Sequence, residues 1–155
     1  MLRACLICVA LAMAALVSPA RAEPFEQLRA AYAARDAAAA ALAYSSDAEV
    51  IYRYAGAPEE RHVGRAAIEA SFAALFAQLD PADRPDLRFR QVLQEGSRRS
   101  GFYRLRLGAD TVLYGAFAVE LSTDGLFARD ISTDATVDDF EAAPAAAPGP
   151  SRNPD

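Results

Sequence analysis

Asp130 is the carboxylate best placed in the sequence to donate or accept a proton. It lies in residues 126–133, whose alternating pattern predicts a strand. On that strand it shares a largely apolar face with Leu126, Ala128 and Ser132. A partly buried carboxylate has a raised pKa and could act as a general acid or base. The alternative, which we expect here, is an ion pair with one of the six arginines in residues 88–106.

Tyrosine and histidine side chains form a second group, as residues that could bind a ligand in a pocket. Alternation places Tyr52 and Tyr54 on one strand face, and a buried hydroxyl requires a hydrogen-bond partner, so Tyr52 is the first candidate for a polar group there. The predicted ligand-binding residues are Tyr32, Tyr52, Tyr54, His62, Tyr103 and Tyr114. The alternative for aromatic residues is core packing, which we expect for Phe72 and Phe76. The alternative for His62, which we expect, is an exposed turn.

No metal or cofactor site is predicted. His62 is the only histidine, and metal ligation requires several side chains that converge on the ion. Both cysteines, Cys5 and Cys8, lie near the N-terminus. The sequence contains no glycine-rich phosphate loop and no nucleophile elbow.

Residues 1–22 are predicted to be a signal peptide. Arg3 precedes an apolar run over residues 4–17, and Ala20-Arg21-Ala22 offers small residues at the cleavage positions. An uncleaved anchor helix is the alternative, although the run is short for a membrane span. Cleavage would leave a periplasmic or secreted chain that starts at Glu23.

The mature chain would carry no cysteine and a net charge of −7, from 14 arginines and 21 acidic residues. This charge argues against nucleic-acid binding and against attachment to an anionic membrane. Residues 141–155 contain four prolines and no large apolar side chain, so a flexible tail is predicted there. The folded part is expected in residues 23–140, one domain by its length.

Helical patterns are found before and after a first predicted strand. Phe25, Leu28 and Tyr32 form one apolar stripe, Asp36 can cap a second helix that runs to residue 44, and a third is expected at 65–79. Alternation predicts strands at 49–54, 87–95, 101–107, 111–121 and 126–133, with a brief pairing at 61–63. Helices gathered ahead of an antiparallel sheet indicate the α+β class.

One extended motif accompanies this order of elements. It reads Tyr44-Ser-Ser-Asp47-Ala-Glu-Val-Ile, then His62-Val-Gly64-Arg65-Ala-Ala-Ile68, then Phe72 and Phe76. The order and the motif resemble the nuclear transport factor 2-like superfamily, in its SnoaL-like bacterial branch, over residues 25–133. The resemblance implies a cone-shaped, cystatin-like fold, in which a strongly curved antiparallel sheet wraps around the third helix and is closed by the N-terminal helices. It also implies an apolar pocket and a homodimer formed through the outer face of the sheet.

Ketosteroid isomerases are well-understood enzymes of this fold, with an aspartate base and an oxyanion hole made of a tyrosine and a protonated aspartate. The resemblance places these three functions near Tyr52, Leu28 and Phe117. None of the three side-chain types is kept, and we therefore do not expect that activity. Related SnoaL-like enzymes place acid–base residues on the last strand, where Asp130 lies.

Two functions of different kinds remain open. The preferred one is an exported binding or accessory module whose pocket holds a small apolar or aromatic ligand, because no complete acid–base set is evident. The alternative is a cofactor-independent lyase, isomerase or hydrolase that uses Asp130 with a tyrosine or His62. A weaker alternative is a dimeric protein-interaction module.

Overall fold

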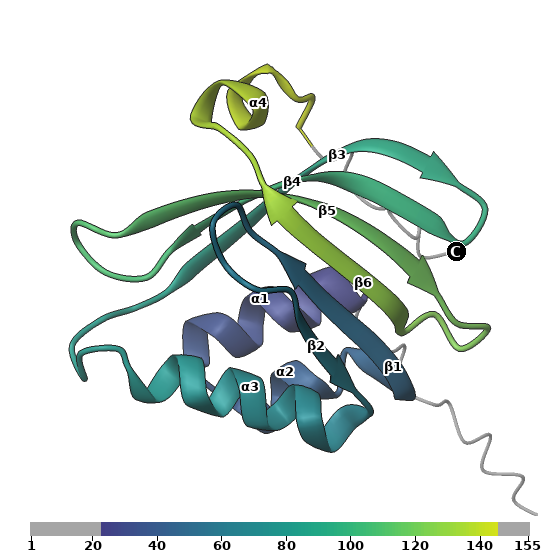
Figure 1. The fold of residues 1–155 in the computed structure, drawn as a ribbon, viewed down its shortest axis with the longest axis horizontal. Coiled ribbons are helices and arrows are strands. Elements are labelled where there is room, and N and C mark those ends of the chain that lie inside the picture. Colours follow the sequence, from purple (N-terminus) through teal and green to yellow (C-terminus); the bar gives the residue numbers. More distant parts are fainter. Residues whose placement is uncertain (1–22, 146–155) are drawn as a thin grey trace, which may run out of the picture.

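The computed structural model describes residues 23–145, apart from the side chains of residues 91 and 92. Its helices are α1 (Pro24–Ala34), α2 (Ala37–Ala41), α3 (Arg65–Ala77) and α4 (Val137–Ala142). Its strands are β1 (Tyr44–Arg53), β2 (Glu60–Val63), β3 (Asp86–Glu95), β4 (Arg98–Arg106), β5 (Val112–Leu121) and β6 (Phe127–Asp134). Figure 1 shows a curved sheet with α1, α2 and α3 on its concave side and α4 on the other side. The predicted α+β class is confirmed.

The strands form one mixed sheet in the order β2-β1-β6-β5-β4-β3. Four of the five neighbouring pairs are antiparallel, and β1 and β6 are parallel. The prediction of an antiparallel sheet is therefore wrong for this one pair. A parallel pair requires a long connection, and here the intervening strands and α3 supply it. The β1–β6 pair matters for the site, because it joins the start of the domain to its last strand.

The N-terminal helices follow the predicted pattern. Phe25, Leu28 and Tyr32 are buried on one side of α1. The side chain of Asp36 caps α2 by accepting the N–H of Ala39 at 2.9 Å. The predicted second helix is nevertheless too long, because α2 ends at Ala41.

The third helix supplies the other half of the core. Gly64 precedes α3 with φ of 81°, a conformation that glycine adopts more easily than other residues, which agrees with its predicted role at this turn. Ile68, Phe72 and Phe76 are buried, as predicted. Helices α1 and α3 meet through Tyr32, whose ring centroid lies 5.7 Å from that of Phe72.

The strand β1 begins five residues earlier than predicted, at Tyr44. Tyr44 pairs with Phe127, and Glu49 pairs with Arg129. The chain advances five residues in β1 but only two in β6 between these pairs, so β1 bulges out of the regular ladder there. The bulge breaks the regular alternation of side chains, which is why the sequence pattern did not indicate a strand there. As a result Tyr44 enters the core, with 1 % of its surface exposed.

The short helix α4 was not predicted. Thr136 and Asp139 cap it reciprocally, and this Thr-x-x-Asp spacing is visible in the sequence. The predicted tail at 141–155 is wrong for its first residues: Glu141 and Ala142 belong to α4, and Ala143 is buried. Arg90 donates to the carbonyl oxygens of Glu141 and Ala143, at 2.6 and 3.1 Å. Residues 146–155 of the predicted tail and the predicted signal peptide lie outside the described residues.

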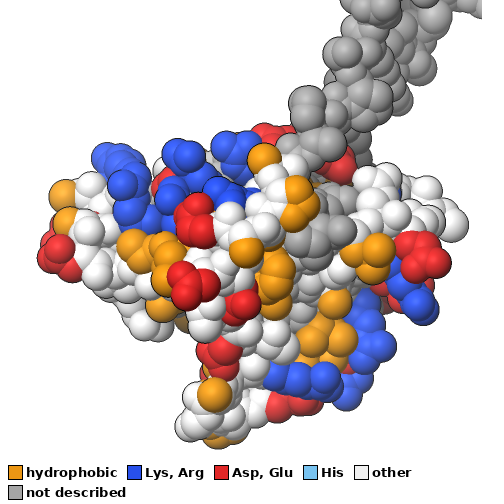
Figure 2. All heavy atoms as spheres, turned by 90° about the horizontal axis from the view of Figure 1, so that it is seen from above, with side chains coloured by type: hydrophobic (Ala, Val, Ile, Leu, Met, Phe, Trp, Pro, Cys, Tyr) orange, Lys and Arg blue, Asp and Glu red, His pale blue; other side chains and the backbone are white. Residues whose placement is uncertain are grey.

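The outer face of the sheet carries arginines, which gather over β3 and β4 in Figure 2. Arg88 and Arg104 both donate to one oxygen of Asp86, at 2.9 and 3.0 Å. Arg90 lies over the ring of Phe140 on α4, 4.7 Å from its centroid. Arg88, Arg90 and Arg104 are therefore engaged on the outer face. Among the described residues no helix is long and apolar enough to cross a membrane.

Candidate functional site

A cavity of about 400 Å³ lies between the concave face of the sheet and the helices α1 and α3. Apart from Tyr103, its wall from β3, β4 and β5 is apolar, with Leu87, Phe89, Leu105, Leu113, Phe117 and Val119. Its wall from β2, β1 and β6 carries polar groups, with Glu60, His62, Tyr52, Asp130 and Ser132. A bound molecule would therefore meet polar groups on one side and hydrocarbon on the other.

Register explains why the polar groups lie together. Asp130 of β6 and His62 of β2 both pair with Val50 of β1, so the three residues form one row across the sheet. In the row two residues further along β1, Tyr52 lies between Glu60 and Ser132. Directly opposite residues in neighbouring strands point to the same face, and this face is the concave one.

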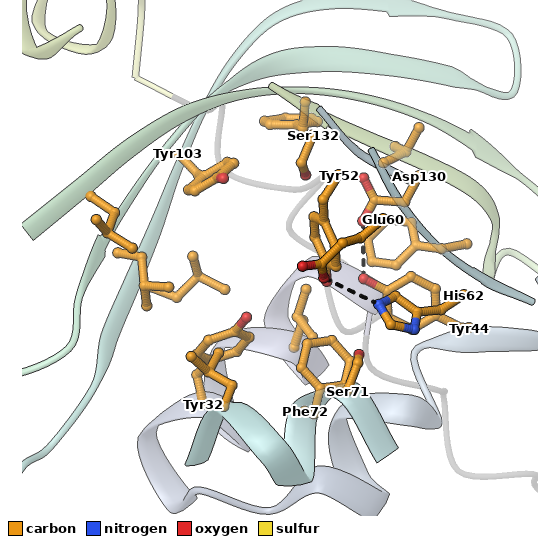
Figure 3. A pocket seen from close by; sticks show the side chains of 18 of the residues that line it. Tyr32, Tyr44, Tyr52, Glu60, His62, Ser71, Phe72, Tyr103, Asp130 and Ser132 are labelled. Carbon is orange, nitrogen blue, oxygen red and sulfur yellow. Dashed lines mark hydrogen bonds and ion pairs between the residues drawn. The ribbon is translucent and has the colours of Figure 1, made fainter. Parts of the chain in front are cut away.

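Asp130 is buried, with 8 % of its surface exposed. The hydroxyl of Tyr44 donates to Oδ2 of Asp130 at 3.0 Å, as the dashed line in Figure 3 shows. The other carboxylate oxygen, Oδ1, is buried without a hydrogen-bond partner in the described part of the chain. Burial raises the pKa of Asp130 from 3.8 to about 6, and the hydroxyls of Tyr44 and Ser132 oppose that rise.

The expected ion pair between Asp130 and a strand arginine is not found among the described residues. Arg88 and Arg104 pair with Asp86 on the outer face instead, while Asp130 lines the cavity. Arg88, Arg90, Arg104 and Arg106 alternate with cavity residues along β3 and β4, so these four point away from the cavity. Arg99 lies opposite the cavity residue Val119, but its guanidinium donates to the carbonyl oxygens of Gly96 and Arg98. Asp130 is consequently a buried carboxylate that no cation in the described residues neutralises.

The predicted neighbours of Asp130 are only partly correct. Ser132 lines the cavity with Asp130, but Phe127 lines it in place of Leu126 and Ala128. The reason is a register shift between β5 and β6: Glu120 pairs with Arg129 and Leu121 with Phe127. One extra residue in β6 reverses the alternation, so that odd-numbered Phe127 and even-numbered Asp130 and Ser132 all face inward.

Tyr44 is a candidate site residue that the sequence did not indicate, and it contacts Asp130 directly. It is held from several sides: Arg65, the first residue of α3, donates from Nε and Nη2 to the Tyr44 carbonyl oxygen at 3.3 and 2.8 Å. The N–H of Phe127 donates to the carbonyl oxygen of Ala43 at 3.0 Å. The motif quoted above contains both Tyr44 and Arg65, and it was the available signal, although residue 44 was predicted to end the second helix.

His62 lies in β2 and lines the cavity, so the expectation of an exposed turn is wrong. Its Nε2 is buried without a hydrogen bond in the described residues, and lies 3.8 Å from Oε2 of Glu60. Figure 3 shows both side chains at the polar side of the cavity. The edge of the Tyr52 ring packs near His62, with centroids 5.9 Å apart. The pocket-edge position considered for His62 is therefore its observed one.

Four of the five predicted tyrosines line the cavity: Tyr32, Tyr52, Tyr54 and Tyr103. The hydroxyls of Tyr54 and Tyr103 are hydrogen-bonded to each other at 2.9 Å. Burial raises the pKa of all four hydroxyls, which keeps them protonated and neutral.

The fifth, Tyr114, is not a cavity residue. Its ring centroid lies 5.8 Å from that of Phe140, on the side of the sheet that α4 covers. Leu113, Phe117 and Val119 of the same strand face the cavity, and alternation along β5 sends Tyr114 the other way. The prediction for Tyr114 is therefore wrong.

The three positions at which the resemblance places ketosteroid isomerase functions, Leu28, Tyr52 and Phe117, all line the cavity. Leu28 and Phe117 present hydrocarbon to the cavity and Tyr52 presents a phenol, whereas the carboxyl group in the cavity wall belongs to Asp130. No cluster of three or more potential metal ligands is present in residues 23–145.

No known family profile matches this chain, and no curated protein matches it. Solved structures do resemble it. A protein of unknown function with a cystatin-like fold from Methylobium petroleophilum aligns with a TM-score of 0.59 and 16% identity, covering 83% of this chain and 79% of that one. A nuclear transport factor 2-like protein of unknown function from Mesorhizobium loti aligns with a TM-score of 0.54 and 21% identity, covering 74% and 90%.

A proposed ketosteroid isomerase from Kribbella flavida aligns with a TM-score of 0.51 and 22% identity, covering 83% of this chain and 82% of that one. At these identities the likeness concerns the fold and not the activity. The chain therefore has the cystatin-like fold of the nuclear transport factor 2-like proteins.

Proposed function

We propose that the protein is a cofactor-independent acid–base enzyme in which Asp130 moves a proton on a small, mostly apolar, uncharged substrate. The observation that carries the proposal is the buried carboxylate of Asp130, which lines the cavity without a cation beside it. A buried, unneutralised carboxylate destabilises a fold, and such groups gather at functional sites. This reverses the preference that the sequence supported.

The two carboxylate oxygens of Asp130 have different roles in this proposal. Oδ2 accepts the hydrogen bond from Tyr44, which fixes the orientation of the carboxylate, and Oδ1 has no partner in the described residues. With a pKa of about 6 the group is mostly ionised at neutral pH yet is a stronger base than an exposed aspartate. Oδ1 is therefore the atom that would accept the proton.

The lining supports an uncharged carbonyl compound as substrate. The carboxylate of Asp130 repels anions, and the apolar wall from β3, β4 and β5 favours a hydrocarbon body. When Oδ1 takes a proton from a carbon next to the carbonyl, the electron pair of that C–H bond moves to the carbonyl oxygen. Neutral phenols are suited to donate to that oxygen. Return of the proton to another carbon is an isomerisation, and loss of a leaving group is an elimination.

A proton-exchange assay tests this reaction without knowledge of the natural substrate. A panel of small cyclic and aromatic ketones is incubated with the protein in D₂O, and deuterium at the carbon next to the carbonyl is followed by NMR. We expect exchange with at least one ketone and its loss in Asp130→Asn. The matched control is Asp124→Asn, an exposed turn carboxylate, which should keep the exchange. Equal exchange in both variants contradicts the proposal.

Ligand binding without chemistry is the second candidate, favoured by the apolar wall and the stacked rings of Tyr52 and Tyr54, whose centroids lie 6.0 Å apart. Native mass spectrometry of protein isolated from its own cells would reveal a co-purified molecule. A bound molecule that the protein leaves chemically unchanged, together with no exchange in the assay above, favours a binding module.

Export and dimerisation remain proposals for this protein. The apolar run in residues 4–17 and the small residues at 20–22 support cleavage before Glu23. N-terminal sequencing of exported protein checks this, and a chain that retains the run contradicts it. Sedimentation of the mature chain checks for the homodimer.

A further inference from the structure

Three tyrosine hydroxyls are directed into the middle of the cavity. Tyr103 comes from β4, Tyr54 follows β1, and Tyr32 faces them from α1. Figure 3 shows the hydroxyls of Tyr32 and Tyr103 pointing into the space between helix and sheet from opposite sides. Burial and the neighbouring Tyr54 both raise the pKa of Tyr32 and of Tyr103, which indicates that the three phenols lie near one another. We call Tyr32, Tyr54 and Tyr103 the tyrosine collar.

The collar lies between Asp130 and one open end of the cavity. Along the inner face of β5, Leu113 is 48% exposed and marks that end. Gly115, opposite Tyr103, comes next, and Val119, opposite Asp130, lies deepest. Gly115 and Val119 are four residue steps apart along the strand, or about 13 Å at ~3.3 Å per step. A molecule that reaches from Asp130 to the open end must therefore pass the collar.

The collar has hydrogen-bonding capacity that the protein does not use. In the Tyr54–Tyr103 pair one hydroxyl donates, so the proton of the accepting hydroxyl remains free for another partner. The hydroxyl of Tyr32 has no hydrogen bond to any described residue, although the residue is 8% exposed and lines the cavity. Two phenol protons of the tyrosine collar are thus available to a molecule in the cavity.

Gly115 is the residue that permits this arrangement. A Cβ at Gly115 would lie 2.2 Å from Cζ and 2.3 Å from the hydroxyl oxygen of Tyr103. The ring of Tyr103 therefore occupies the space that any larger side chain would fill, and from there its hydroxyl reaches Tyr54. Gly115 determines the collar without contacting a ligand itself.

We propose that the tyrosine collar is a binding subsite for an uncharged oxygen, an ether, carbonyl or hydroxyl, in the middle part of an elongated apolar ligand. The proposal rests on the proposed binding of such a molecule in the cavity, and not on proton transfer by Asp130. It assigns the ligand three parts: a head at Asp130, an oxygen at the collar and an apolar end near Leu113.

A series of isosteric probes tests the subsite. The parent is 4-heptylphenol, and in each other member an ether oxygen replaces one methylene of the chain. Affinities are measured by displacement of the neutral fluorophore N-phenyl-1-naphthylamine. We expect one oxygen position to bind about 3- to 10-fold more tightly than the parent in the natural protein, as one neutral hydrogen bond allows. If no position exceeds the parent, the proposal is wrong.

Variants locate the effect. Tyr103→Phe keeps the ring but removes the hydroxyl and should abolish the preference for oxygen; Gly115→Ala, which displaces the ring, should do the same if it folds. Tyr114→Phe is the matched control, because this tyrosine lies on the outer face, and it should keep the preference. An unchanged preference in Tyr103→Phe overturns the proposal. Asp130→Asn should retain the affinity ratio, so a failure of the acid–base reaction is distinguishable from a failure of the collar.

Discussion

The hydroxyl of Tyr44 donates to Oδ2 of Asp130 at 3.0 Å, although 86 residues separate them in the sequence. The parallel pairing of β1 with β6 brings them together. Both are buried and line the cavity, and Asp130 forms no ion pair with a described residue. The pair therefore joins a proton-accepting carboxylate to a neutral donor that orients it.

Asp130→Asn should change the pH dependence of stability. Because the pKa of Asp130 is raised from 3.8 to about 6, the unfolded chain ionises first, and the free energy of unfolding falls as pH rises through this interval. Above pH 6 the penalty is complete, at about 3 kcal/mol, since a tenfold change in acidity is about 1.4 kcal/mol. Asparagine removes the penalty and can still accept the Tyr44 hydrogen bond.

Chemical denaturation of both proteins between pH 4 and pH 8 measures this difference. The variant should match the natural protein near pH 4 and exceed it by up to about 3 kcal/mol at pH 7. A variant that is less stable at pH 7 would mean that Asp130 has a cationic partner, contrary to the structure.

Tyr44→Phe should raise the pKa of Asp130 above about 6, because the Tyr44 hydrogen bond favours the ionised carboxylate. A ¹³C NMR titration of the Asp130 carboxyl reports this directly. For any activity that needs ionised Asp130, the acidic limb of the pH–rate profile should then shift to higher pH. Tyr52→Phe is the control, since Tyr52 does not contribute to the Asp130 shift. Equal titration in all three proteins would exclude the Tyr44 contribution.

The sequence predicted the regular parts of this protein well, because helices and most strands bury one periodic face. Phe25, Phe72 and Phe76 were placed correctly on that basis. The errors at the site come from two irregularities, the bulge after Tyr44 and the extra residue in β6, which break the alternation. Tyr114 was misplaced for a different reason: it lies in the predicted strand, but alternation puts it on the face opposite to Leu113 and Phe117.

The role of Asp130 could be only half predicted. Its apolar face indicated burial, and burial was confirmed. The arginine partner was expected from the number of nearby arginines, but number does not determine face or partner. Arg88 and Arg104 lie on the outer face with Asp86, and Arg99 donates to the carbonyl oxygens of Gly96 and Arg98. Distinguishing an ion pair from an isolated carboxylate requires the register of three strands, which a single sequence does not specify.

Phe72→Ala should destabilise the domain by about 3–5 kcal/mol, because it leaves a cavity between α3 and the residues around Tyr44. Its ring centroid lies 5.7 Å from that of Tyr32 and 6.0 Å from that of Tyr44. Phe102→Ala is a matched control on the opposite face of the sheet, where the ring is only partly buried. The measurement is the free energy of unfolding in urea. A loss below about 1 kcal/mol for Phe72→Ala would mean that the ring contributes to an open pocket and not to the core.

Truncation after Phe140 should lower stability, contrary to what the composition of residues 141–155 suggests. It removes the last turn of α4 and the carbonyl groups of Glu141 and Ala143, to which Arg90 donates. It also leaves Arg90, which is about three-quarters buried by its side chain, without these acceptors. We expect a loss of about 1–3 kcal/mol and a melting temperature lower by several degrees, measured by calorimetry.

Glu141→Ala removes the side-chain ion pair alone and should cost about 0–1 kcal/mol, because that carboxylate is more than half exposed. If truncation costs no more than this substitution, the backbone acceptors do not hold α4 on the sheet.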